Sequence, residues 1–173
     1  MTGEEKDRLK KLRWESERKK KQLHLSEKLD QLISNEVVEF LSAEDSDKIQ
    51  LTADNWPDNK WDDLLYFQSE IQNKTPIDEI IKKFTAINKG NFVLLLFMNF
   101  NFGFVKVSNS ALNNHWANFL DIDGDEIFCY QPEETGFICI EKTEDIIATD
   151  GSKNRQWIYE VTFSNQNIKS KLI

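Results

Sequence analysis

The spacing of the apolar residues changes at Gly90, and this change divides the sequence into a helix-forming part and a strand-forming part. Before Gly90, apolar residues recur every three or four positions, which is typical of helices with one buried face. After Gly90, the segment 92–98 is apolar at every position, as expected of a central strand covered on both faces. Later segments alternate between apolar and polar residues. The sequence therefore predicts an α+β domain.

The most clearly marked helix begins at Thr75 and Pro76. Thr75 is expected to cap the open amides, and Pro76 to fill the first helical position. Gly90 is placed to end this helix. Earlier in the chain, the apolar spacing predicts a core helix from about residue 25 to 41, then a polar break over 42–47, and a further helix around residues 61–71.

The segments after Gly90 predict an antiparallel sheet of five to six strands in hairpin order, with the N-terminal helices packed on one face. Asp123 and Gly124 form a dipeptide well suited to a two-residue hairpin turn, because both positions of that turn need positive φ. The expected strands are 92–98, 104–107, 116–122, 125–131, 137–141 and 157–163.

Charge separates the first 21 residues from the rest. Residues 1–21 carry nine Lys or Arg against five Asp or Glu, a net charge of +4. Because the whole chain has a net charge of −8, residues 22–173 have a net charge of −12. The short segment has only three apolar residues between 4 and 21, which predicts a weakly docked helix. We expect a charged helical extension over 1–21 and one α+β domain over 22–173.

The chain is expected to be cytoplasmic. Its first residues lack an apolar signal region, and the longest apolar run is far shorter than the ~20 residues that cross a bilayer. The acidic domain would repel nucleic acid and anionic membranes over most of its surface and attract basic partners. The basic run 18–21 lacks interleaved aromatic residues, so a solvated helix end is favoured over a nucleic-acid site.

Metal and cofactor sites are not expected. The carboxylates around Asp123 lack the glycine and bidentate glutamate spacing of a calcium loop, and the two histidines and two cysteines lack zinc-ligand spacing. The common nucleotide, metalloprotease and serine-hydrolase motifs do not occur. If 132–136 is a loop, Cys129 lies opposite Cys139 within disulfide range; reduced thiols are the favoured alternative.

The order of segments from 91 to 163 supplies a resemblance. An apolar strand is followed by HWANFLDIDGDEIFCY, PEETGFICI, EKTED and WIYEVTF. This order resembles the small α+β immunity proteins encoded beside bacterial polymorphic toxins of the contact-dependent inhibition type. The resemblance implies a protein that binds and occludes a toxin domain. Toxin nucleases are commonly basic, so an acidic binding face would suit this task.

The leading hypothesis is therefore a protein-binding protein, an immunity protein for a basic toxin. Its face would combine acidic residues at strand ends with an exposed aromatic anchor, Trp116 or Trp56. The acidic candidates are Asp121, Asp123, Asp125, Glu133, Glu134 and Glu144.

Two alternatives remain open. One is a small enzyme that uses His115 or a pair of carboxylates in a pocket between helices and sheet. Its candidate carboxylates are Glu126, Glu133, Glu134, Glu141, Glu144 and Asp145. The other is an adaptor that acts through its N-terminal helix.

Overall fold

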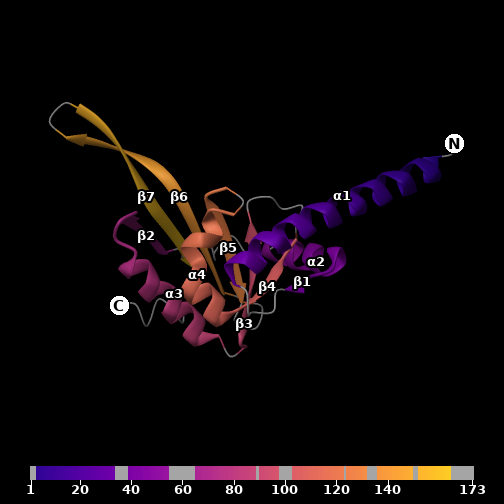
Figure 1. Ribbon diagram of the computed structural model, residues 1–173, viewed down its shortest axis with the longest axis horizontal. Helices are drawn as coiled ribbons and strands as arrows, with labels where there is room; N and C mark the ends of the chain where they lie inside the picture. The colour runs from indigo at the N-terminus through magenta and orange to yellow at the C-terminus, as the bar shows by residue number, and fades with distance from the viewer. Residues whose placement is uncertain are drawn as a thin grey trace.

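The computed structural model describes residues 3–33, 39–54, 65–88, 90–97, 103–122, 124–131, 136–149 and 152–164. These residues form the expected α+β fold, with four helices and one seven-stranded antiparallel sheet (Figure 1). The helices are α1 (Gly3–Leu32), α2 (Ala43–Asp54), α3 (Thr75–Ile87) and α4 (Asn109–Leu120). The strands are β1 (Glu39–Phe40), β2 (Leu65–Glu70), β3 (Phe92–Phe97), β4 (Val105–Ser108), β5 (Glu126–Gln131), β6 (Gly136–Thr149) and β7 (Ser152–Ser164).

The sheet has the strand order β1-β4-β3-β5-β6-β7-β2. Its central strands follow the sequence prediction, since β3, β5 and β7 lie where apolar or alternating segments predicted them. The first half of the chain supplies both outer strands, which the sequence did not indicate. As a result β2, an early segment, lies beside β7, the last described strand.

The helix α3 confirms the clearest sequence prediction. Its buried residues Ile77, Ile80, Ile81 and Phe84 recur at three- and four-residue spacing. Pro76 lies in its first turn, as expected. The capping role expected of Thr75 is wrong, because Lys74 occupies the N-cap position and no side chain caps this end.

Two predicted elements are of the wrong type. The helix expected around 61–71 is the strand β2 over its described part, and its side chains follow a period of two, with Leu65 and Phe67 packed against the core. The segment 116–122, expected as a strand, is the end of the helix α4 and the turn that follows it. Ser108 caps this helix by accepting a hydrogen bond from the Ala111 amide at 2.9 Å. The apolar residues before Asp121 have helical spacing, and Trp116, Phe119 and Leu120 are all buried. Gly124 has a positive φ of 86°, but the turn joins a helix to a strand.

The expected polar break over 42–47 contains the start of α2. Ser42 accepts a hydrogen bond from the Asp45 amide at 3.1 Å, which is the usual way for a serine to start a helix. The core helix expected over 25–41 ends earlier, at Leu32, and Phe40 is in strand β1.

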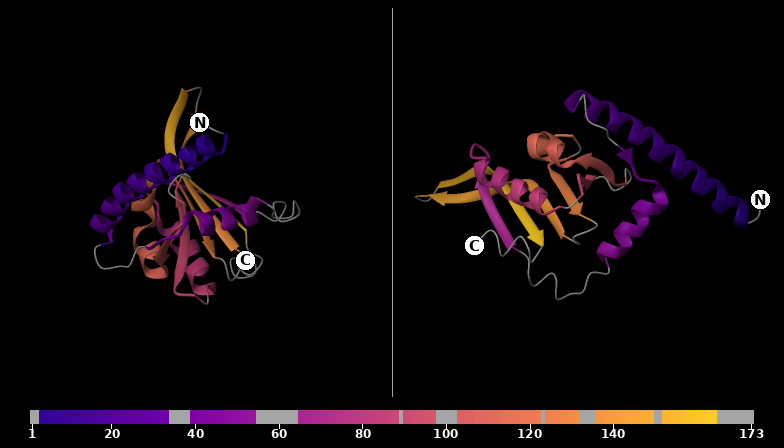
Figure 2. Two further views of the ribbon diagram at one scale, coloured as in Figure 1. Left: turned by 90° about the vertical axis from the view of Figure 1, so that its right-hand side faces the viewer. Right: turned by 90° about the horizontal axis from the view of Figure 1, so that it is seen from below.

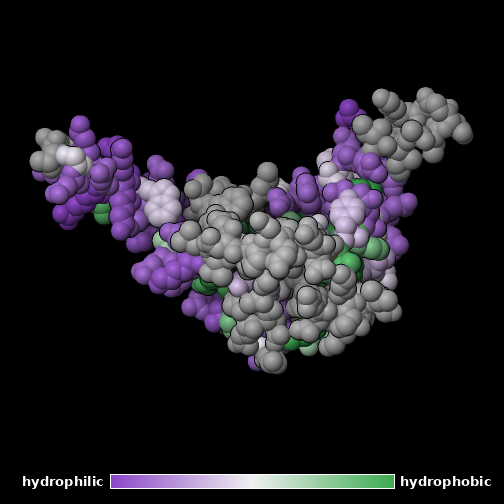
Figure 3. All heavy atoms as spheres, turned by 180° about the vertical axis from the view of Figure 1, so that it is seen from behind, coloured by the Kyte–Doolittle hydropathy of each residue, from purple (hydrophilic) through white to green (hydrophobic). Residues whose placement is uncertain are grey.

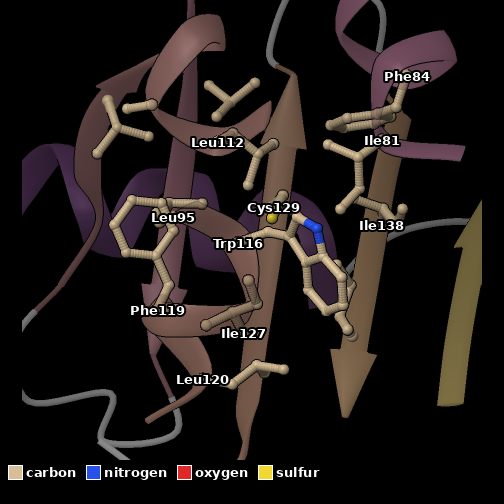
Figure 4. Packing of buried hydrophobic residues seen from close by; sticks show 14 of the residues in the cluster. Ile81, Phe84, Leu95, Leu112, Trp116, Phe119, Leu120, Ile127, Cys129 and Ile138 are labelled. Carbon is tan, nitrogen blue, oxygen red and sulfur yellow. The ribbon is translucent and has the colours of Figure 1, made fainter. Parts of the chain in front are cut away.

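The two faces of the sheet are covered differently. The main core lies between one face and the helices α3 and α4, and α1 contributes Leu25 and Leu29 to it (Figure 4). A smaller apolar cluster on the other face includes Leu94, Tyr130 and Phe137, and Ile49 of α2 packs against it. This second cluster is confined to β3, the adjoining parts of β5 and β6, and the segment before β4. The parts of β5, β6, β7 and β2 farther from α2 carry mainly polar side chains on that face, together with Tyr66 and the buried Ile158.

The helix α1 is continuous across residue 21, where the sequence suggested a boundary. Its residues 3–14 are exposed, and Arg18, Leu25 and Leu29 are its buried residues. Figure 1 shows its N-terminal part projecting away from the sheet. The proposed division at residue 21 remains a prediction.

The strands β6 and β7 extend past the rest of the sheet as a two-stranded arm, seen in Figures 1 and 2. Pairing with β5 ends at Glu141, and pairing with β2 begins at Ile158. Residues 144–149 and 152–157 therefore pair only with each other among the described strands.

The two cysteines are free and are not opposite each other. Gln131 pairs with Gly136, one residue earlier than expected, so Cys139 lies opposite Phe128 and Cys129 opposite Ile138. A shift of one residue moves a side chain to the other face of a sheet. Cys129 is accordingly in the main core, and Cys139 faces the opposite side.

Candidate functional site

The described members of the predicted acidic face lie near the base of the arm. Asp121 and Asp125 lie 3.3 and 3.6 Å from the Lys142 ammonium nitrogen. Glu144 is 3.1 Å from a guanidinium nitrogen of Arg155. Each of these three carboxylates therefore has a cationic partner. Asp123, Glu133, Glu134 and Trp56 lie outside the described residues.

Trp116 is not an exposed anchor, and this part of the prediction is wrong. Its side chain is only 2% exposed, because the helical spacing of α4 directs it onto the sheet (Figure 4). Its indole N–H donates to Asp78 at 2.7 Å, and its ring meets the ring of Tyr159 edge to face at 5.1 Å. These contacts make Trp116 part of the core.

A different set of carboxylates lies on the face of the sheet away from α3 and α4. Glu126, Glu141 and Glu160 are direct neighbours across β5, β6 and β7, and Gln68 on β2 continues the row. The adjacent residues Ile127, Ile140 and Val161 are fully buried in the main core. Since side chains alternate along a strand, the row must point to the opposite side.

Two further carboxylates extend this group. Glu70 and Asp145 are two and four residues from members of the row along β2 and β6, so they share its face. We define the acidic face as Glu70, Glu126, Glu141, Asp145 and Glu160. Figure 3, seen from behind, shows hydrophilic atoms gathered over the arm.

Neutral hydrogen-bond donors contact the row. The Tyr66 hydroxyl donates to Glu160 at 2.6 Å, and the Gln68 amide donates to the same oxygen at 2.9 Å. The Cys139 thiol donates to Glu126 at 3.3 Å. Within the described residues, no lysine or arginine forms an ion pair with Glu126, Glu141 or Glu160. The row therefore differs from Asp121, Asp125 and Glu144 at the arm base, each of which has such a pair.

Burial and neighbouring carboxylates raise the pKa of one member of the row and of a thiol beside it. Partial burial and the nearby charges of Glu126 and Glu160 raise the pKa of Glu141. Burial, followed by the charge of Glu126, raises the pKa of the Cys139 thiol well above its usual range. Cys139 is therefore a neutral thiol at pH 7 and lacks the thiolate character of a nucleophilic cysteine.

The structure does not bring His115 together with this row. His115 is on α4, where its ring lies 6.5 Å from that of Phe119, on the main-core side of the sheet. Glu126 and Glu141 point to the other side. Among the described residues, no group of three His, Cys, Asp or Glu side chains is arranged to hold a metal ion.

Part of the acidic face was visible in the sequence. Glu126, Glu141 and Asp145 were among the candidate carboxylates, whereas Glu70 and Glu160 were not. The alternation of 157–163 indicates that Glu160 points away from Trp157 and Tyr159. Only the pairing of β6 with both β5 and β7 places the three glutamates side by side.

Comparisons with protein-family models, with curated proteins and with solved structures yield no match to this chain. Within the described part of the chain, no helix combines the length and the apolar stretch needed to span a membrane.

Proposed function

We propose that this protein binds a basic protein partner through the acidic face. The observation that supports this proposal is the row of Glu126, Glu141 and Glu160. These three carboxylates lie at directly opposed positions and have no ion pair among the described residues. Like charges at such positions destabilise a sheet. A lysine or arginine from a partner would relieve this repulsion and thereby favour binding.

Tyr66 supplies an aromatic contact on the same face. Its side chain is 57% exposed, and its hydroxyl is held by Glu160 and Gln68. An aromatic ring fixed by hydrogen bonds loses little conformational entropy on binding, which is one reason that tyrosine is frequent in protein interfaces. In this proposal Tyr66 replaces Trp116 as the anchor.

In its most specific form, the proposal is an immunity protein that occludes a basic toxin. The resemblance over residues 91–163 and the charge of −12 on residues 22–173 support this form. Such a charge attracts a basic toxin over long distances and disfavours polyanions.

The test is co-expression with the toxin domain encoded beside the gene, followed by measurement of their affinity. The triple variant E126Q/E141Q/E160Q keeps the side-chain shapes and removes three charges. We expect it to weaken binding at least about tenfold, in line with the cost of losing several interfacial charge pairs. The matched control D121N/D125N/E144Q also removes three charges, but from carboxylates that already have cationic partners.

A larger loss of affinity for the triple variant than for the control supports the acidic face. Equal losses would show that only total charge matters. If no toxin domain from that locus binds and co-expression gives no protection, the immunity form of the proposal is wrong.

A further inference from the structure

A groove runs between the outermost strand β2 and the helix α3. It has a volume of about 360 Å³, and its apolar lining is Leu65, Phe67, Pro76, Ile80 and Phe163. Tyr66, Glu79 and Lys83 also line it, and the last two contribute opposite charges. Figures 1 and 2 show β2 and α3 at the same side of the sheet. An apolar groove beside an edge strand is the arrangement in which peptides bind by strand addition.

The outer edge of β2 has backbone groups available for pairing. The amide of Ile71 donates to the carbonyl of Trp157, which fixes the hydrogen-bonding phase of the β2–β7 pair. Since the phase alternates, Leu65, Phe67 and Ser69 face β7, whereas Tyr66 and Gln68 direct their backbone N–H and C=O groups outward. In the described residues these outward groups have no backbone partner. The carbonyl of Glu70 is already used, because it accepts from the Asn73 amide at 2.9 Å.

We infer that β2 receives an extended segment of the basic partner as an eighth strand of the sheet. This inference rests on the proposed function and specifies how the partner is recognised. Side chains of an added strand alternate between the two faces. One set would enter the apolar groove, and the other would lie beside Tyr66, Gln68 and Glu160 on the acidic face.

The expected segment therefore alternates apolar residues with lysine or arginine. The edge supplies affinity through main-chain hydrogen bonds, the groove selects apolar side chains, and the acidic face selects cations. A second copy of this chain is disfavoured as the occupant, because pairing β2 with its own copy would extend one acidic face beside another and bring Glu70 and Glu160 close to like charges.

The probe is a seven-residue peptide of alternating valine and lysine with blocked ends. Its binding is followed by the amide NMR shifts of the full-length protein, and we expect the largest shifts at Tyr66 and Gln68. The control peptide is N-methylated at alternate amides, so that one edge cannot donate hydrogen bonds. Two such peptides are needed, one methylated at the odd amides and one at the even amides, so that each edge is blocked in turn. If both bind as well as the unmethylated peptide, strand addition is wrong.

The matched variants are Gln68→Pro and Gln68→Ala. Proline removes the outward N–H of residue 68 without removing a bond to β7, and proline is tolerated on the open side of an edge strand. Alanine removes the same side-chain contact with Glu160 but keeps the N–H. Gln68→Pro loses the main-chain hydrogen bond of residue 68 to the peptide and weakens the hydrogen bonds next to it. It should therefore bind the peptide about tenfold more weakly than Gln68→Ala.

The outcomes separate this inference from the proposed function. If E126Q/E141Q/E160Q weakens peptide binding but Gln68→Pro does not differ from Gln68→Ala, the acidic face binds cations and strand addition is wrong. If Gln68→Pro weakens binding and the triple glutamine variant does not, the edge binds an extended chain and the charge-based function is wrong. A homodimer that Gln68→Pro dissociates would identify a second copy as the occupant. Circular dichroism of each variant checks that the fold is retained.

Discussion

At the scale of single residues, Gly103 and Arg18 form a tight contact between the segment before β4 and α1. Gly103 has a φ of +71°, and a Cβ atom built on it would collide with the Arg18 guanidinium and lie 2.7 Å from the Ser46 hydroxyl. The same hydroxyl accepts the Phe104 amide at 3.1 Å. Arg18 is only 5% exposed, and its guanidinium carbon lies 5.1 Å from the centre of the Trp14 ring. Glycine at 103 therefore makes room for a buried arginine.

We expect Gly103→Ala to lower the free energy of unfolding by about 1–3 kcal/mol, because alanine is strained at positive φ and its methyl group displaces Arg18. Urea denaturation monitored by circular dichroism gives the difference. Gly3→Ala is the matched control, since a Cβ at Gly3 has no heavy atom within 4 Å. Equal stability of the two variants would contradict the close approach at Gly103.

Glu141 gives a prediction on pH. Its folded-state pKa is raised above the ordinary value of 4.5, mainly by partial burial and then by Glu126 and Glu160. As pH rises through this window, the unfolded state loses its proton first, so the contribution of Glu141 to stability falls with increasing pH. Glu141→Gln should therefore be more stable than the wild type at pH 7, and the difference should shrink at pH 4. The gain should be at most about 0.5 kcal/mol, because water still reaches much of this partly buried side chain and screens its charge.

The matched control for this measurement is Glu144→Gln, which removes a carboxylate that is paired with Arg155. It should give no gain at pH 7. Urea unfolding at low ionic strength, at pH 4 and pH 7, distinguishes the two variants. An equal stability gain in both variants would contradict repulsion within the row. So would a gain for Glu141→Gln that grows toward pH 4.

At the scale of elements, α1 consists of an exposed first half and a docked second half. The buried positions Arg18, Leu25 and Leu29 are seven and four residues apart, so they share one side of the helix. Residues 3–14 precede all of them and are exposed. The docking of the helix therefore depends on residues from 18 onward.

Two truncations test this division. Removal of residues 1–13 should leave the urea midpoint nearly unchanged, because the described residues that it removes, 3–13, are all exposed. Removal of residues 1–20 also deletes Trp14 and Arg18 and should destabilise the protein by about 1–3 kcal/mol while preserving cooperative unfolding. If both truncated proteins were equally stable, Arg18 would contribute nothing and residue 21 would be an adequate boundary for the extension.

The elements that could be predicted from the sequence are those whose local pattern agrees with their environment. The strand β3 is apolar throughout and buried on both faces, and α3 has a consistent helical face. The strand β2 was mistaken for a helix because Leu64, Leu65 and Ile71 imitate helical spacing, although its pairing with β7 determines its conformation. The acidic face required the register of β5 and β6, and an error of one residue there reverses which side chains share a face.

At the scale of the whole molecule, the two faces of the sheet differ. One face packs against helices to form the main core, and part of the other carries carboxylates. The helices α3 and α4 cover the first face with the main core, and α2 covers only part of the second. The remaining part of the second face carries the acidic face and adjoins the open edge of β2. The acidic face and the open edge of β2 therefore lie next to each other. The carboxylates at the arm base, in contrast, are paired with Lys142 and Arg155.

This arrangement predicts how association should depend on salt. Residues 22–173 carry a charge of −12 and should be attracted to a basic partner over the Debye length, which falls from ~30 Å at 0.01 M salt to ~8 Å at 0.15 M. Stopped-flow or surface plasmon resonance measurements should therefore show an association rate that falls about tenfold or more over this range.

Two variants separate attraction from contact. E126Q/E141Q/E160Q should reduce both the association rate and its salt dependence, because it removes three charges that have no ion pair among the described residues. Tyr66→Ala removes a half-exposed aromatic ring without changing the charge, so it should leave the association rate nearly unchanged and increase the dissociation rate. If Tyr66→Ala slowed association while the triple variant did not, the roles assigned to the two groups would be reversed, and the acidic face would serve only to hold a partner that reaches the protein by another surface.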